Sequence, residues 1–180
     1  MQISVKKPQK NLELTEEITA VANEINTILN LKQKDRYFEG IAIVHSFIED
    51  MLKWLVFTQI VWNRSREESQ SMMTGEVEKI RAYCNGLNFY SLLNTGLATG
   101  LFTFDFFTKL DNTRRERNSL VHQYWIYIHK GKRLIFRKKL EKLAGIGSDL
   151  VKCFNRLVDE IGWIDDSFFE ISRGRNFVVL

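Results

Sequence analysis

The sequence predicts an all-α fold, a bundle of four to five main helices. Three observations carry this prediction. Proline occurs once in 180 residues, at Pro8, so nothing interrupts long helices downstream. Apolar residues recur at spacings of three and four over several long segments. Apolar residues make up 44% of the chain and charged residues 27%, which is the balance of a globular domain large enough to bury its own core.

The elements begin after a polar, basic lead-in over residues 1–12. Helical spacing starts at Leu14, where Thr15-Glu-Glu supplies the acidic start that suits a helix N-terminus. The clearest segment runs from about 36 to 62 and predicts a helix of about seven turns. Its seam consists of Phe38, Ile41, His45, Ile48, Leu52, Leu55, Gln59 and Trp62. Within this seam we expect His45 to be a core histidine whose hydrogen bonds are satisfied.

The second half of the chain continues this pattern after a polar loop over 63–75. Further helical stretches are expected over 76–85, 86–95, 104–125 and 140–161, with a bend at Gly96 and Gly100. The segment near 127–136 fits either a short hairpin or two helix ends. The helical domain then spans 13–162, and residues 163–180 form a C-terminal tail.

Composition narrows the classes of function. The chain has no run of about 20 apolar residues and no apolar signal core, so we expect no membrane span and a cytoplasmic protein. Cys84 and Cys153 lie in helical patterns and suggest buried thiols rather than a disulfide. No histidines and cysteines have metal-ligand spacing, so no metal or other cofactor is expected. A net charge of +4 permits a polyanionic partner without demanding one.

The fourth long helix carries the residues that point to chemistry. Its expected apolar stripe consists of Leu110, Val121, Trp125 and Ile128. Arg117 falls inside that stripe, and Asn118, His122 and Tyr124 line its edges. A buried charge is costly unless it is paired, so Arg117 should meet a carboxylate such as Glu49 or Asp50, a partner subunit or a phosphate.

The run Arg117-Asn-Ser-Leu-Val-His122-Gln-Tyr124 resembles the Arg-x4-His-x-Tyr motif of HEPN domains (higher eukaryotes and prokaryotes nucleotide-binding). The earlier helix, with Ser46-Phe-Ile-Glu49-Asp50, resembles the acidic long helix of these domains. The fold-level resemblance covers about residues 14–162, whereas the motif itself covers eight residues.

This resemblance implies a metal-independent endoribonuclease that forms homodimers and joins two Arg/His pairs in one cleft. Arg117 and His122 would be the catalytic pair, supported by Asn118, Tyr124 and Glu49, with Arg114 and Arg115 on the RNA backbone. His122 would move a proton of the 2′-hydroxyl or the leaving oxygen, and Arg117 would hold the phosphate. The family includes toxins whose motif tyrosine can be modified by a nucleotidyltransferase antitoxin, which makes such an antitoxin a candidate partner.

Two other readings remain open. A domain of the same fold could bind RNA or a nucleotide without cutting it. Alternatively, the chain could be a helical protein-interaction module in which Arg117 belongs to an internal ion pair. A carboxylate of the same chain on Arg117, together with a buried His122, would favour the interaction module.

Overall fold

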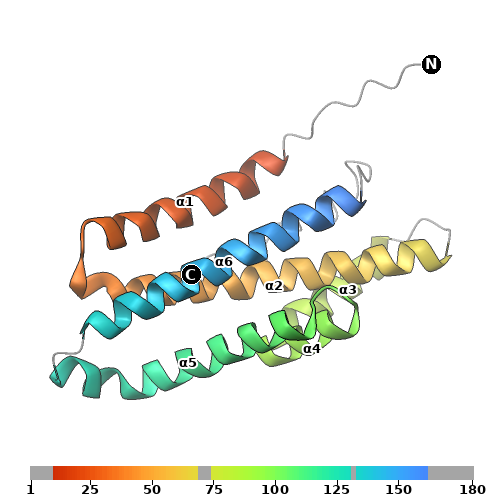
Figure 1. Cartoon of the computed structure of the whole chain (residues 1–180). Helices are drawn as coiled ribbons and strands as arrows, with labels where there is room; N and C mark the ends of the chain where they lie inside the picture. The colour runs from red at the N-terminus through yellow and green to blue at the C-terminus, as the bar shows by residue number, and fades with distance from the viewer. Residues whose placement is uncertain (1–9, 69–73, 131–132, 162–180) are drawn as a thin grey trace.

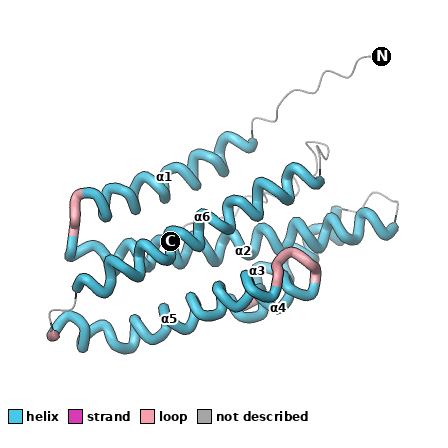
Figure 2. Tube along the Cα trace, viewed as in Figure 1, coloured by secondary structure: helices cyan, strands magenta, loops and turns pink. Residues whose placement is uncertain are grey.

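The computed structural model describes residues 10–68, 74–130 and 133–161, and every element within these ranges is helical (Figure 2). The α-helices are α1 (Lys10–Asn30), α2 (Tyr37–Glu68), α3 (Thr74–Gly86), α4 (Phe89–Ala98), α5 (Phe104–His129) and α6 (Arg133–Ile161). A short 3-10 helix, η1 (Lys34–Arg36), links α1 to α2. The all-α prediction is therefore confirmed. No helix in the described ranges is long and apolar enough to cross a membrane.

Helix α2 is the centre of the bundle (Figure 1). Helix α6 packs along it, α1 lies beside both, and the shorter α3 and α4 also pack on α2. Helix α5 contacts α4 with its first half and α6 with its second half. The α5–α6 pair runs antiparallel, so the end of α5 lies beside the start of α6 (Figure 1).

The core follows the 3-4 seam that the sequence shows in α2. Ile48, Leu52 and Leu55 are fully buried there, and Leu140 and Leu150 of α6 are equally buried. The two helices approach closely at Gly40, where an added Cβ would lie 2.8 Å from the Leu140 side chain. Burial of this apolar seam is the main favourable term for the fold.

The helix boundaries differ from those predicted at several positions. Helix α1 begins at Lys10, inside the lead-in expected over residues 1–12, and α5 continues past residue 125 to His129. Helix α2 continues to Glu68, into the expected polar loop, and α3 already begins at Thr74. The possible hairpin near 127–136 is wrong for the described residues, because Tyr127 belongs to α5 and Phe136 to α6. Short apolar runs fit a helix as well as a strand, and tertiary packing decides between them. The tail over 163–180 lies outside the described residues.

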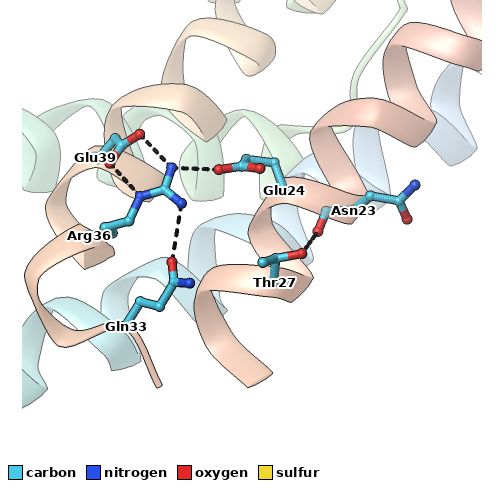
Figure 3. A network of polar contacts seen from close by, with 6 residues as sticks. All are labelled: Asn23, Glu24, Thr27, Gln33, Arg36 and Glu39. Carbon is cyan, nitrogen blue, oxygen red and sulfur yellow. Dashed lines mark hydrogen bonds and ion pairs between the residues drawn. The ribbon is translucent and has the colours of Figure 1, made fainter. Parts of the chain in front are cut away.

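The connection between α1 and α2 is held by Arg36 (Figure 3). Its guanidinium donates to both carboxylate oxygens of Glu39 at 2.7 and 2.8 Å, and to Glu24 of α1 at 2.6 Å. A third donor group reaches Gln33 at 3.1 Å. The hydrogen bond from Arg36 lowers the pKa of Glu39. One residue of η1 thus fixes the end of α1 to the start of α2.

The bend predicted at the two glycines exists at one of them. Gly100 ends α4 with a left-handed φ of 76°, and the Leu101 N–H donates to the Gly96 carbonyl at 2.9 Å, a helix-terminating arrangement that favours glycine. Gly96 instead lies within α4, where the Phe102 ring packs against it.

We predict opposite effects for alanine at two helical glycines. A Cβ at Gly96 would lie 2.2 Å from the buried Phe102 ring, so Gly96→Ala should cost about 1–3 kcal/mol through overpacking. Gly145 lies exposed within α6 with no atom within 4 Å of an added Cβ, so Gly145→Ala should stabilise by about 0.5–1 kcal/mol. Urea unfolding of both variants measures the difference. Equal effects would contradict the close packing at Gly96.

Both cysteines are free thiols, as expected. Cys84 of α3 is 1% exposed and belongs to the core, which confirms its predicted burial. Cys153 of α6 is only partly buried. The two thiols therefore differ in their access to solvent.

Candidate functional site

The motif residues all lie on the second half of α5. This helix begins after Thr103, whose hydroxyl accepts a hydrogen bond from the Phe106 N–H at 3.3 Å. It then runs without interruption to His129. One straight element therefore sets the relative positions of Arg117, Asn118 and His122.

The buried face of α5 is rotated from the predicted stripe. Leu110 is fully buried, as expected, but Leu120 rather than Val121 continues the buried face, at 2% exposure against 49% for Val121. The prediction for Val121 was therefore wrong. Asp111 and Thr113 are also buried on α5, and the prediction missed both. The Trp125 side chain lies outside the described set. Because α5 packs on different helices along its length, one straight stripe does not describe it.

Arg114 and Arg115, the predicted RNA contacts, both bind Asp111. Their Nε atoms donate to different oxygens of this carboxylate, at 2.8 and 2.7 Å. Arg114 also lies over the Tyr90 ring, 5.1 Å from its centroid. Burial raises the pKa of Asp111, but the two arginines outweigh it and the net pKa is lowered. Our sequence reading overlooked Asp111, although spacings of three and four to two arginines are a helix ion-pair signal.

Glu116 of α5 pairs with lysines of α6. Its carboxylate accepts a hydrogen bond from Lys142 of α6 at 2.5 Å and lies 3.8 Å from the Lys139 ammonium. Three consecutive charged residues before Arg117 are thus occupied by ion pairs within the chain.

Arg117 differs from these neighbours. Its side chain is exposed, and within the described ranges no carboxylate lies within 4 Å of its guanidinium. Its Nη1 donates a weak hydrogen bond of 3.3 Å to the Asn118 side chain. The predicted partners Glu49 and Asp50 instead lie 3.4 Å from Lys53 on their own helix. The expectation that Arg117 is buried in an apolar stripe was wrong.

His122 is exposed on α5. On a helix it lies about 140° around the axis from Arg117, so one copy of α5 presents the two side chains in different directions. The structure thus places Arg117 and Asn118 in contact, whereas His122, one turn after Asn118, is directed away from Arg117 within one chain.

His45 of α2 is a neighbour of Arg117 that our sequence reading did not connect to it. The imidazole is 5% exposed, its ring lies 5.1 Å from that of Phe89, and its Nε2 has no hydrogen-bond partner in the described part of the chain. Burial and the positive charge of Arg117 lower the pKa of His45, while Glu49 opposes them. His45 is therefore buried as predicted, but its Nε2 is not satisfied.

Tyr124 has a packing role. Its ring lies 4.3 Å from Phe38 of α2 and 6.0 Å from Phe136 of α6. Phe136 also contacts Tyr127 at 5.7 Å. These four rings form an aromatic cluster that holds the second half of α5 against α2 and α6.

Two surface hollows lie elsewhere. One, of about 290 Å³, is lined by Gln59, residues 100–103 and the end of α6. The other, of about 750 Å³, lies between α2 and α3. Neither includes Arg117 or His122, and the described residues hold no cluster of metal ligands. Comparisons with protein-family models, with curated proteins and with solved structures find no match to this chain.

Proposed function

We propose that this chain is a metal-independent endoribonuclease of the HEPN type. Its active site would form where two copies bring their α5 helices together. A cytoplasmic toxin–antitoxin or defence role is the setting that the family resemblance suggests.

The observation that carries the proposal is the exposed, unneutralised guanidinium of Arg117. Arg114, Arg115 and Glu116 all have ion-pair partners within the chain, whereas Arg117 has none among the described residues. An interaction module with an internal ion pair at Arg117 predicts the opposite. A free guanidinium next to an amide and one turn and a half from a histidine is suited to a phosphate.

A second copy supplies what one α5 lacks. Because Arg117 and His122 diverge on one helix, a facing helix is needed to bring an arginine and a histidine to the same phosphate. The exposed Val121 and Ile126, at 49% and 52%, offer apolar surface on this part of α5. Burial of that surface against a second copy would be favourable.

The chemistry needs no metal. His122 of one copy would take the proton of a ribose 2′-hydroxyl, whose oxygen attacks the adjacent phosphorus. The bond to the 5′-oxygen breaks, His122 of the other copy protonates that oxygen, and a 2′,3′-cyclic phosphate remains. Arg117 would stabilise the charge on the phosphate, with Asn118 orienting it. Tyr124 and Glu49 would help to hold these residues in position.

The decisive experiment is cleavage of a labelled RNA by the full chain in excess EDTA, with DNA of the same sequence alongside. We expect cleavage of RNA only, because DNA lacks the 2′-hydroxyl. Binding of RNA without cleavage would favour the non-catalytic reading. If a nucleotidyltransferase antitoxin acts on Tyr124, its addition to the assay should suppress cleavage.

A further inference from the structure

The first ten residues of α6 carry a strong excess of positive charge. Residues 133–142 contain five of the 26 lysines and arginines and one of the 22 acidic residues. The remaining 170 residues therefore hold 21 basic and 21 acidic side chains and carry no net charge. The entire formal charge of +4 belongs to this segment.

Within the segment, we call Lys138, Lys139 and Lys142 the lysine cluster; Lys139 and Lys142 face α5, and Lys138 lies one turn before Lys142 on the exposed surface of α6. Lys139 and Lys142 both approach the same carboxylate, that of Glu116. Lys138 is exposed and has no ion pair in the described ranges, although Arg137 beside it pairs with Glu141 at 2.9 Å. One carboxylate thus pairs with two of the three lysines and none in the described ranges pairs with Lys138, so the cluster keeps excess positive charge.

This arrangement opposes the stability of α6. The positive end of the helix dipole lies at the N-terminus, and the first turn of α6 contains no acidic residue. Lys138 and Lys142, four residues apart, and Lys139 and Lys142, three apart, repel each other along the helix. Charges that weaken their own helix are typical of a functional surface.

The lysine cluster lies next to the motif. Glu116, which binds Lys142, directly precedes Arg117 in α5. Phe136, six residues before Lys142, packs on Tyr124 of the motif. The start of α6 therefore runs alongside the half of α5 that bears Arg117 and His122 (Figure 1).

We propose that the lysine cluster of α6 binds the sugar-phosphate backbone of the RNA next to the proposed active site. The inference rests on the proposed function, which makes RNA the polyanion that reaches this surface. Lysines contact phosphates without reading bases, so the cluster would set the path of the strand rather than its sequence.

The test is RNA binding by fluorescence anisotropy with a labelled single strand of about 20 nucleotides. The His122→Ala variant serves as a non-cleaving background. In it, Lys138→Gln/Lys142→Gln is compared with Lys109→Gln/Lys152→Gln, which removes the same charge from exposed lysines of α5 and the far half of α6. Each lost phosphate contact reduces the log–log salt slope by about 0.7. At about 0.1 M salt, this predicts roughly 25-fold weaker binding for the first pair and a far smaller change for the control.

Equal weakening by both pairs, or none by either, overturns the inference. The inference is also overturned if the His122→Ala variant binds phosphatidylserine vesicles more tightly than RNA and the vesicle binding is weakened by Lys138→Gln/Lys142→Gln. The proposed function is judged separately, on the active chain. If that chain cleaves RNA while Lys138→Gln/Lys142→Gln binds RNA as the unsubstituted chain does, the cluster is wrong and the nuclease stands. If Lys138→Gln/Lys142→Gln abolishes RNA binding but the unsubstituted chain never cleaves RNA, the lysine cluster stands and the nuclease is wrong.

Discussion

Replacing His122 by alanine should lower RNA cleavage by roughly 10²–10⁴-fold, the usual contribution of a general acid or base. Arg117→Ala should cost about 10²–10³-fold, because the charge on the phosphate loses its stabilising partner. Both side chains are exposed, so neither change should alter the free energy of unfolding by more than about 0.5 kcal/mol. Initial rates of RNA cleavage in EDTA, together with urea unfolding, measure both quantities.

The same chain offers matched controls for these two variants. His129 is a second exposed histidine of α5, seven residues further along, and Arg156 is an exposed arginine in the far half of α6 that already pairs with Glu160. His129→Ala and Arg156→Ala should leave cleavage within a few-fold of the original rate, on the order of what surface substitutions cause. If His122→Ala cuts as fast as His129→Ala, the proposed active site is wrong.

Phe136→Ala should destabilise the protein by about 3–5 kcal/mol, the range for loss of a buried aromatic ring. Phe136 is 1% exposed and its ring contacts Phe38, Tyr124 and Tyr127 at centroid distances of 5.7–6.0 Å. Its removal leaves a cavity where α2, α5 and α6 meet. The midpoint of urea unfolding should fall accordingly.

The control for this prediction is Phe104→Ala, since Phe104 is 69% exposed at the start of α5. Its unfolding free energy should change by less than about 0.5 kcal/mol. Phe136→Ala should also lose RNA cleavage at denaturant concentrations at which the unsubstituted chain is still folded, because the aromatic cluster positions the half of α5 that bears the motif. Similar destabilisation by both phenylalanine changes would contradict the cluster as the anchor of α5.

The fold was largely predictable because its helices carry strong periodicity. The seam from Phe38 to Trp62 anticipated α2 within a few residues at its start, and Leu140 to Ile161 anticipated most of α6. Helix ends were less predictable. Residues 63–68 are polar but continue α2, since hydrogen bonding along an existing helix adds little cost. Tyr127 and Phe136 were ambiguous until packing joined their rings.

The candidate site was predictable as a set of residues but not as an arrangement. Spacing placed Arg117, Asn118 and His122 on one helix, which the structure confirms. Spacing could not show that Leu120 would replace Val121 on the buried face, because that depends on how α5 packs against its neighbouring helices. The nearness of His45 to Arg117 joins α2 to α5, and no local pattern encodes a contact between distant helices.

Because Cys84 is buried, the reactivity of its thiol reports the unfolding of the protein. Burial raises its pKa to about 11, so at neutral pH the thiolate that reacts with alkylating reagents is almost absent while the chain is folded. Alkylation of Cys84 should therefore proceed only when α3 leaves the core, at a rate that follows the opening equilibrium. Cys153, which is partly buried, should be modified earlier. The two labelling rates would separate local opening of α6 from loss of the whole bundle.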